Sequence, residues 1–493
     1  LALAQCFESI GKFEAARERY AAALAARPSD AAVLRSLAGF CVRTSQLTEA
    51  EGHLRQLMNR KVVATDEDVA WARRNLAWVR AATGGREGIA EALGLVGLRL
   101  DSSGNLLPPE RTLPAEQHRQ EQQARARVLA VHARRSFRRQ AIIILEDLNK
   151  LESLGPDDLY LLAQLHEADG NWTRARQDFR DLLAARADTP AFLSHFIQSL
   201  LRHGDLEEAR SCLDRLERLE QARQVEPGSF GTTRLRAGYL QARGDSDKAL
   251  DMLRANAGRK DARPEEVLLL IGYLAGRNQI EEALAACEQA WSTCAPEAAA
   301  RASLATLRSG KPTEEQIGRV EGWIQSAREK SPKSAAPLLF LAELRDLQKK
   351  YADAEALYRQ VLKSDPSNGT ALNNLAWLLA QKTDADGAAE ALKLIDRAIE
   401  VHGPAPGLLD TRASVNLARG QATAAVRDLE EANTESPGAP RLFHLARAQL
   451  KAKDRAAAVK TFAEAKRLGF DPQQLHPLER DLAGRFANEL GSR

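Results

Sequence analysis

The stretch LYLLAQLHEADGNWTRARQDFRDLL, residues 159–183, predicts two helices that are separated by a turn at Gly170. Leu159 and Leu162 share one face of the first helix because they are three residues apart, and the second helix has a similar apolar face. Glycine readily adopts the left-handed conformation that ends a helix and reverses the chain. The stretch therefore predicts a helical hairpin with one apolar face.

The same pattern returns 34 residues later in FLSHFIQSLLRHGDLEEARSCLDRL, residues 192–216, with its turn at Gly204. In both stretches a small residue follows the turn by five positions. Such a residue recurs along the whole chain, at Ala16, Ala50, Ala92, Ala141, Ala175, Ala209, Ala249, Ala283, Val320, Ala354, Ala391, Ala425 and Ala458. Six of the twelve intervals in this alanine column are 34 residues, a period that predicts stacked helix pairs.

Other positions of the repeat also hold the same kind of residue from unit to unit. Small residues lie where the first helix must touch the second, at Ala4, Ala38, Ala163, Ala342, Ala376, Ala413 and Ala446. Small side chains on both helices permit close packing. An aromatic residue follows the alanine column by four at Tyr20, Phe179, Tyr358 and Phe462. The turn position of Gly170 is held elsewhere by Gly11, Gly204, Gly244, Gly420 and Asn278.

These positions resemble the tetratricopeptide repeat family, whose unit is a helix–turn–helix with Gly or Ala at the eighth place and Ala at the twentieth. The resemblance covers nearly the whole chain. It departs from the family at the fourth place, where Leu stands for Trp at Leu34, Leu159, Leu193, Leu338 and Leu372. The resemblance implies an all-α fold, a right-handed superhelical solenoid of antiparallel helix pairs with about 13 repeats.

Interruptions of the period suggest the domain organisation. Pro108, Pro109 and Pro114 lie in a polar run, which predicts a linker or hinge. We expect an N-terminal repeat block at 1–100, this linker at 101–124, a main array at 125–476 and a C-terminal capping helix at 477–493. A cap is needed because the last unit would otherwise leave its apolar face exposed to water.

Composition limits the classes of function. Lys+Arg 70 against Asp+Glu 67 leaves a net charge of +3, so we expect no nucleic-acid partner. No apolar run approaches the roughly 20 residues of a membrane span. The chain begins at Leu1 rather than Met, so we expect a missing upstream segment. A cytoplasmic location is favoured, export stays open, and the sequence does not indicate an oligomeric state.

Motifs for catalysis and for cofactors are missing from the sequence. There is no HExxH, no glycine-rich phosphate loop and no GxSxG, and the five cysteines form no CxxC pair. We therefore expect no metal, no cofactor and no enzymatic activity.

An arginine-rich run, RARVLAVHARRSFRRQ at residues 125–140, has six arginines and no acidic residue. It has two interpretations. It could dock an acidic partner or a nucleic-acid backbone, or it could be the solvated face of a helix. Replacing Arg134 and Arg138 by Glu separates the two, because only the docking interpretation predicts a loss of partner binding.

Two tryptophans occupy matching places. NLAWVRAATGGREGIAEAL at 75–93 aligns without gaps to NLAWLLAQKTDADGAAEAL at 374–392. The family resemblance implies that Trp78 and Trp377 point into the concave groove, where each could stack on a bound peptide. The alternative is that each packs against its neighbouring helix. The resulting candidates for groove residues are Tyr160, Gln164, Ser194, Gln198, Asn373, Trp377 and Trp78.

The sequence thus predicts a non-catalytic scaffold that binds peptides or partner proteins in the concave groove of a solenoid. The main alternative is a regulatory or docking region of a larger enzyme, a kinase or a glycosyltransferase, whose catalytic domain lies upstream of Leu1. A helical-repeat reader of RNA is a third class, but it predicts a basic groove and regular base-reading pairs that the sequence does not supply.

Overall fold

The computed structural model describes residues 1–59, 62–83, 85–100, 106–107, 115–131, 134–185, 189–222, 229–382 and 385–491. In these residues the chain forms 27 α-helices, and the first 26 make thirteen consecutive pairs, units 1 to 13. The first helices of the units, the A helices, are α1 Ala2–Ser9, α3 Ala31–Arg43, α5 Asp66–Thr83, α7 Ala115–Val131, α9 Pro156–Ala168, α11 Pro190–Arg202, α13 Phe230–Ala242, α15 Pro264–Gly276, α17 Pro296–Arg308, α19 Ala336–Leu347, α21 Gly369–Ala380, α23 Pro406–Ala418 and α25 Ala439–Lys451. The second helices, the B helices, are α2 Phe13–Ala26, α4 Leu47–Leu57, α6 Gly85–Leu95, α8 Arg135–Leu151, α10 Trp172–Ala185, α12 Leu206–Ala222, α14 Ser246–Ala257, α16 Ile280–Thr293, α18 Glu314–Lys330, α20 Tyr351–Ser364, α22 Ala385–His402, α24 Ala422–Glu435 and α26 Arg455–Arg467.

The alanine column explains why the helices pair. All thirteen of its residues lie on B helices and have 0 % exposed surface. The facing small residues of the A helices are buried as well, with exposures of 0 % or 1 %. Small residues on both sides let the two helix axes approach closely. The predicted all-α solenoid of about 13 repeats is confirmed, and Val320 fits its place in the column.

In nine of the thirteen units, the residue five positions before the alanine column has left-handed backbone, including all six turn positions that the sequence predicts. Gly170 has a φ of +87°, and Asn278 has a φ of 59° at the matching place. Residues with a β-carbon hold this place in three further units, at Ser45, Lys349 and Lys453. The left-handed conformation costs such residues roughly 1–2 kcal/mol. Stacking of the units therefore maintains turns that the local sequence disfavours.

We expect Gly170→Ala to lower the free energy of unfolding by about 1 kcal/mol, because the left-handed backbone penalises a β-carbon. A β-carbon at Gly170 would meet no atom within 4 Å, so only backbone conformation changes. Gly52 is the matched control, since it has the same free space but lies inside helix α4. Gly52→Ala should raise stability by roughly 0.5–1 kcal/mol. Chemical denaturation measures both, and equal signs would contradict the assignment of the turn.

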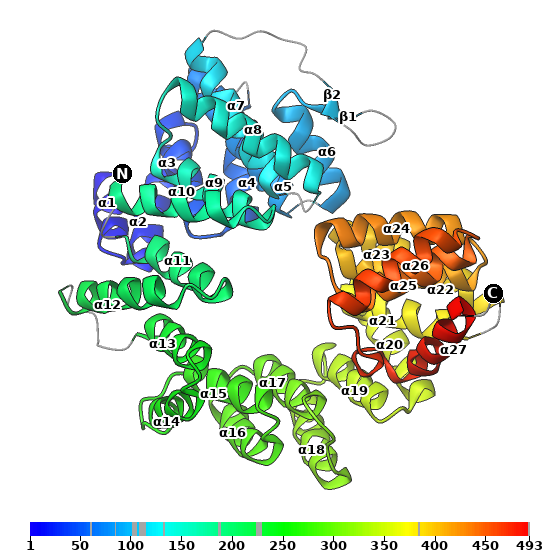
Figure 1. Ribbon diagram of the computed structural model, residues 1–493. Helices are drawn as coiled ribbons and strands as arrows, with labels where there is room; N and C mark the ends of the chain where they lie inside the picture. Colours follow the sequence, from blue (N-terminus) through cyan, green and yellow to red (C-terminus); the bar gives the residue numbers. More distant parts are fainter. Residues whose placement is uncertain are drawn as a thin grey trace.

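Neighbouring units stack so that A helices lie side by side. The chain curls through an arc in which α11, α13, α15 and α17 face the inner side (Figure 1). Their partners α12, α14, α16 and α18 form the outer side (Figure 1). The A helices of adjacent units contact one another, as in α5 with α7 and α21 with α23. The A helices thereby form a continuous surface toward the inside of the arc.

The array curls far enough for units 3 and 4 to meet units 11 and 12. Helix α6 contacts α22, although nearly 300 residues separate them (Figure 1). The approach involves the backbone, because a β-carbon on Gly85 would lie 2.7 Å from the carbonyl oxygen of Val401. Gly85 also has a φ of +54°, a left-handed conformation that favours glycine. Glycine is therefore required here for two reasons, the backbone conformation and the lack of space for a β-carbon.

Charged groups join the same two parts of the chain in what we call the closure contact: Arg134, Arg135, Arg138, Glu431 and Glu435. Arg134 Nε lies 3.2 Å from Glu431 Oε1, and Arg138 Nη1 lies 3.6 Å from Glu435 Oε2. The backbone N–H of Arg135 donates to Glu435. Burial raises the pKa of Glu435, because the loss of water outweighs this hydrogen bond and the charge of Arg138. The charged form of Glu435 is therefore stabilised by the backbone N–H of Arg135 and by the charge of Arg138.

The expected linker at 101–124 lies partly outside the described residues. Its described part holds β2 Leu106–Leu107, which pairs antiparallel with β1 Arg99–Leu100, and the start of α7. After unit 13 the chain continues through the short helices η1 Pro472–Gln474 and η2 Pro477–Glu479 into α27 Arg480–Gly491. The expected domain boundaries stay predictions. Within the described ranges, no helix combines the length and apolarity that crossing a membrane requires.

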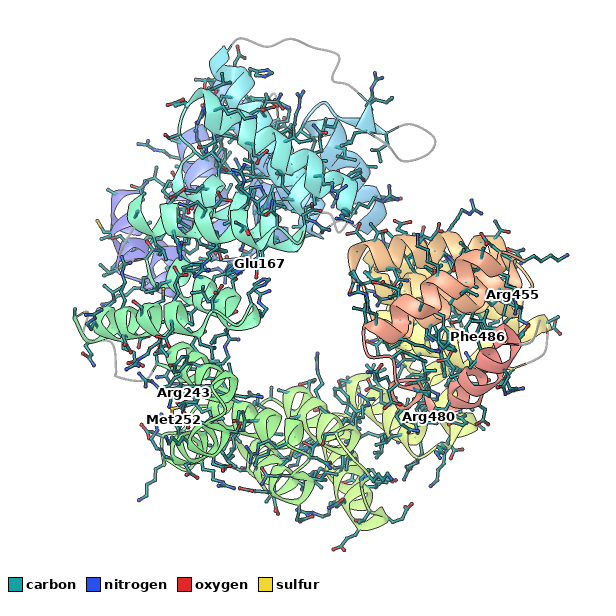
Figure 2. All side chains as sticks on the ribbon, in the orientation of Figure 1. Glu167, Arg243, Met252, Arg455, Arg480 and Phe486 are labelled. Carbon is teal, nitrogen blue, oxygen red and sulfur yellow. The ribbon has the colours of Figure 1, made fainter. Side chains whose placement is uncertain are left out.

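Helix α27 covers the last unit with an aromatic contact. Its Phe486 is 3 % exposed, and the ring centroid lies 5.5 Å from that of Phe443 and 5.2 Å from that of Phe462. Both contacts are edge-to-face, the favoured geometry for aromatic pairs. Figure 2 places Phe486 between α27 and the rest of the last unit. The three rings thus bury an apolar contact between α27 and unit 13, and the capping role of 477–493 stays a prediction.

Candidate functional site

The candidate site is the inward surface of the A helices, here called the inner wall. The seven groove residues that the sequence suggests all lie on A helices and are all half-buried: Trp78, Tyr160, Gln164, Ser194, Gln198, Asn373 and Trp377. Half-burial leaves part of each side chain accessible while neighbouring atoms hold it in place. Figure 2 places Glu167, at the end of α9, on this inner side.

In units 5 and 6 the inner wall has a polar cluster around a histidine. Tyr160 Oη lies 2.6 Å from His195 Nδ1, and Gln164 Nε2 lies 3.1 Å from the same nitrogen. Burial lowers the pKa of His195, which keeps its ring neutral at pH 7, so that its single Nδ1 lone pair can accept a hydrogen bond that the two donors share. The Tyr160 ring also packs on Phe192, with centroids 4.8 Å apart. The hydrogen bond to His195 and the packing on Phe192 thus hold the Tyr160 side chain in place.

The structure brings Tyr160 and Gln164 together through His195, a residue that the sequence analysis did not select. Ser194 and Gln198 lie on the same helix, α11, next to His195 and less than one turn beyond it. A polar residue inside the apolar stripe of α11 was the available signal for His195. A histidine at such a place is more often a packed residue than a ligand-binding one, so this signal was weak.

Trp78 lines a pocket of about 450 Å³ between the A helices α3, α5 and α7. Its other lining residues include Trp71 and Arg35, whose guanidinium lies 4.9 Å from the centroid of the Trp71 ring. The polar part of the lining also includes Glu67, Arg74, Asn75, Gln120, Gln123 and Arg127. The pocket combines aromatic faces with amide and guanidinium donors, which suits a polar peptide segment.

The arginine-rich run lies next to this pocket and pairs largely within the chain. Arg127 Nη2 lies 2.7 Å from Asp158 Oδ1, and the buried Arg125 donates from Nε to the carbonyl oxygen of Val96 at 2.9 Å. Arg135 and Arg139 both contact Asp169. Neither predicted interpretation describes this arrangement, because the run is neither a free basic patch nor a fully solvated face.

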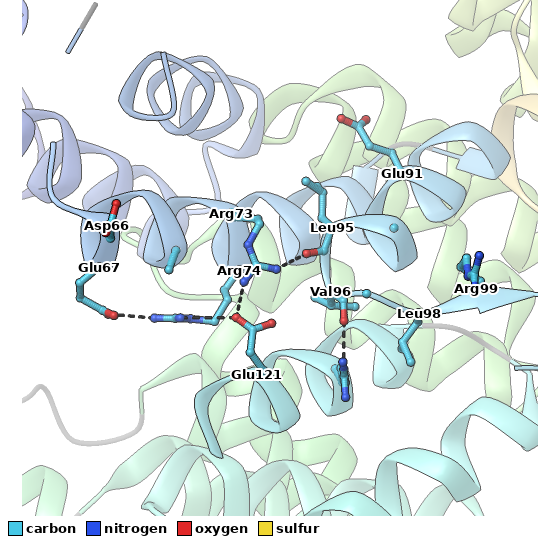
Figure 3. Close-up of a pocket in the computed structure, with 14 residues that line it drawn as sticks. Asp66, Glu67, Arg73, Arg74, Glu91, Leu95, Val96, Leu98, Arg99 and Glu121 are labelled. Carbon is cyan, nitrogen blue, oxygen red and sulfur yellow. Dashed lines mark hydrogen bonds and ion pairs between the residues drawn. The ribbon is translucent and has the colours of Figure 1, made fainter. Parts of the chain in front are cut away.

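A larger pocket of about 1220 Å³ lies between α5, α6 and α7 (Figure 3). Its walls carry four acidic and four basic side chains: Asp66, Glu67, Glu91, Glu121, Arg73, Arg74, Arg99 and Arg125. Figure 3 shows the buried Glu121 held between Arg73 and Arg74, and Arg74 in turn pairs with Glu67 at 2.9 Å. The charges balance, so the pocket offers no net attraction for an ionic ligand.

In the C-terminal units the predicted residue Trp377 is in contact with the chain itself. The centroid of its ring lies 4.3 Å from that of His476, which belongs to the segment after α26. Asn373 Nδ2 donates to Asn374 Oδ1 at 3.1 Å, and Asn374 donates to the hydroxyl of Tyr358. In these units the inner wall is therefore covered by a later segment of the same chain, the residues around His476.

No group of three or more histidine, cysteine or acidic side chains suited to a metal ion occurs in the part of the chain that the structure describes.

The tetratricopeptide repeat family model matches the chain three times, at residues 1–58, 160–224 and 326–407. Each match falls on units whose alanine column and left-handed turns are described above. The chain carries tetratricopeptide repeats in these three regions. A search of curated proteins found no match for this repeat protein.

Several solved structures are similar to this repeat protein. Yeast Tom70 is 17 % identical with a TM-score of 0.38, over 99 % of this chain and 94 % of that chain. Cut9 in the APC/C hetero-tetramer Cut9-Hcn1 is 13 % identical with a TM-score of 0.36, over 99 % and 89 % of the two chains. TTC0263, a thermophilic TPR protein of Thermus thermophilus, is 18 % identical with a TM-score of 0.30, over 36 % and 92 %. At these values the functions of those proteins do not transfer to this chain.

Proposed function

We propose that the protein is a non-catalytic scaffold that holds peptides or partner proteins against its inner wall. The observation that carries this proposal is the combination of polar and aromatic side chains that are half-buried on consecutive A helices. We assign Tyr160, Gln164 and Gln198 to this surface, together with the pocket at Trp78. Rigid helices present such side chains at fixed spacing, which lowers the entropic cost of binding an extended or helical segment.

Polar donors on the wall give the scaffold its specificity. A peptide that lies along A helices meets one side chain per unit, so recognition adds up from unit to unit. The amides of Gln164 and Gln198 each offer two donors and one acceptor oxygen. A partner that leaves these groups unpaired loses roughly 1–3 kcal/mol for each buried group.

We expect the double variant Gln164→Ala with Gln198→Ala to bind its partners about tenfold or more weakly, since two hydrogen-bonding groups at about 1 kcal/mol each are lost. The experiment uses the intact chain as bait in lysate of the source cells, followed by titration of each recovered protein. Gln177→Ala is the matched control, because Gln177 is an exposed glutamine on the B helix α10. Equal affinities for the wall variant, the control and the unmodified chain would contradict the proposal.

A further inference from the structure

The chain crosses its own inner side after unit 13. From the end of α26 it runs through η1 and η2 toward α19 before α27 begins (Figure 1). We call Phe470–Glu479 the crossing segment. Its Leu475 is 4 % exposed and packs in a cluster with Phe443 and Phe486. The crossing segment is therefore anchored by an apolar side chain at its centre.

His476 connects the crossing segment to units 10 and 11. Its Nε2 atom lies 3.3 Å from Asp346 Oδ1 at the end of α19, and its ring meets the Trp377 ring edge-on. The centroid of the Tyr351 ring lies 5.8 Å from that of His476. One imidazole thus contacts half-buried aromatic and acidic groups of two units that lie more than 90 residues earlier in the chain.

Glu479 connects the crossing segment to unit 13. It is 3 % exposed, and its Oε1 atom lies 3.7 Å from His444 Nε2 and 4.0 Å from Arg447 Nη1. Burial alone would lower the pKa of His444, but Asp410, 2.8 Å from Nδ1, and Glu479 together raise it above its ordinary value. The wall at this point presents the Arg447 cation to the Glu479 carboxylate, next to a histidine whose charged form Asp410 and Glu479 favour.

The fit of Glu479 is incomplete. Among the described residues, neither Glu479 Oε1 nor His444 Nε2 has a hydrogen-bond partner, although both atoms are buried. A buried polar group without such a partner costs roughly 1–3 kcal/mol. The distances of 3.7 Å and 4.0 Å give charge attraction without a hydrogen bond. A peptide with a better-placed carboxylate would bind this wall more favourably than the crossing segment does.

We propose that the inner wall of units 10 to 13 is a binding site for acidic peptides, and that the crossing segment occupies it as an internal competitor. The proposal rests on the proposed function, since it assigns a partner chemistry and a means of regulation to the same wall. The expected partner resembles the crossing segment: an apolar residue at the place of Leu475, a ring at His476 and a carboxylate at Glu479.

Tethering explains how the segment regulates the site. A segment linked to its own site acts at an effective concentration of about 1 mM or more. The apparent affinity for an added peptide falls by the fraction of molecules in which the site is free. If the segment is docked in about 99 % of molecules, the added peptide binds about a hundredfold more weakly than to an empty site. Weakening the segment should therefore increase binding in trans.

The test uses the full chain and a fluorescent peptide with the sequence GFDPQQLHPLERD, residues 469–481. The double variant Leu475→Ala with Glu479→Gln weakens the crossing segment and leaves the wall intact. We expect it to bind the peptide at least tenfold more tightly than the unmodified chain, as measured by fluorescence anisotropy. Glu479→Gln alone keeps the shape of the side chain. If the double variant does not fold, this single variant should still bind the peptide more tightly than the unmodified chain.

Two further variants define the site. Adding Arg447→Met to Glu479→Gln removes the permanent cation of the site and should abolish the gain in peptide binding. Glu489→Gln on α27 is the matched control, because the Glu489 carboxylate pairs with Lys451 at 3.9 Å and is half-exposed. It should leave peptide binding unchanged. The proposal is overturned if weakening the segment gives no gain, or if the gain survives Arg447→Met. The wall of units 5 and 6 is then still tested separately by Gln164 and Gln198.

Discussion

Phe179→Ala is expected to lower the free energy of unfolding by about 3–5 kcal/mol, the usual cost of removing a buried aromatic ring. Phe179 is fully buried on α10 and stacks on Phe196 of α11, with ring centroids 5.2 Å apart. Its ring also meets those of Tyr160 on α9 and His195 on α11. The side chain thus joins both helices of unit 5 to unit 6, and its loss weakens the stack as well as one helix pair.

Thermal and chemical denaturation followed by circular dichroism measure this effect. Phe13→Ala is the matched control, because Phe13 lies at the start of the B helix α2 but is 51 % exposed. Substitutions at exposed sites usually change stability by no more than about 0.5 kcal/mol. Similar losses for Phe179→Ala and Phe13→Ala would show that the rings between units do not hold the array together.

Arg138→Met is expected to open the closure contact. Removing one partner of a buried ion pair costs up to roughly 3–5 kcal/mol, and without Arg138 the buried Glu435 keeps only the backbone N–H of Arg135 and the charge of Arg134 as compensation. The side chains of Arg138 and Glu435 are 11 % and 6 % exposed. Such a loss reduces the ratio of closed to open molecules more than a hundredfold. Small-angle X-ray scattering should then give a larger radius of gyration, since units 3 and 4 separate from units 11 and 12.

Removing both charges should restore closure. The double variant Arg138→Met with Glu435→Gln leaves no buried ion at the contact, and such replacements are often neutral. Its scattering should return toward that of the unmodified chain. Arg139→Met is the control, because Arg139 contacts Asp169 3.3 Å away and takes no part in the closure contact. If Arg138→Met leaves the scattering curve unchanged, Arg138 does not hold the array closed.

The repeated part of the architecture could be predicted from the sequence because it depends on local rules. The alanine column fixes where two helices touch, and every residue of it is fully buried. Gly170 has the left-handed backbone that its place in the pattern predicts. Lys349 and Lys453 have the same backbone without a glycine, because packing of the neighbouring units compensates for the local cost. Periodicity therefore predicted the fold even where individual residues departed from it.

The contacts that close the array could not be predicted in this way. Arg134 and Glu431 are 297 residues apart, and no periodic signal connects them. The arginine run was visible in the sequence, but its partners on α24 and at Asp169 were not. The same holds for His476, which contacts Trp377 although the sequence analysis placed it at the end of the main array, 125–476. The place of Trp377 on an A helix was predicted. Its contact with His476 was not, because that contact depends on how far the whole array curls.

Hydrogen–deuterium exchange of the Phe179→Ala variant tests the central claim most directly, that successive helix pairs share one continuous interior which builds the inner wall. Exchange is followed by mass spectrometry of peptides from each helix. A shared interior predicts that protection falls together in α9, α10 and α11, while α23 to α25 keep the protection of the unmodified chain. A loss of protection confined to α10, with α9 and α11 unchanged, would contradict the account.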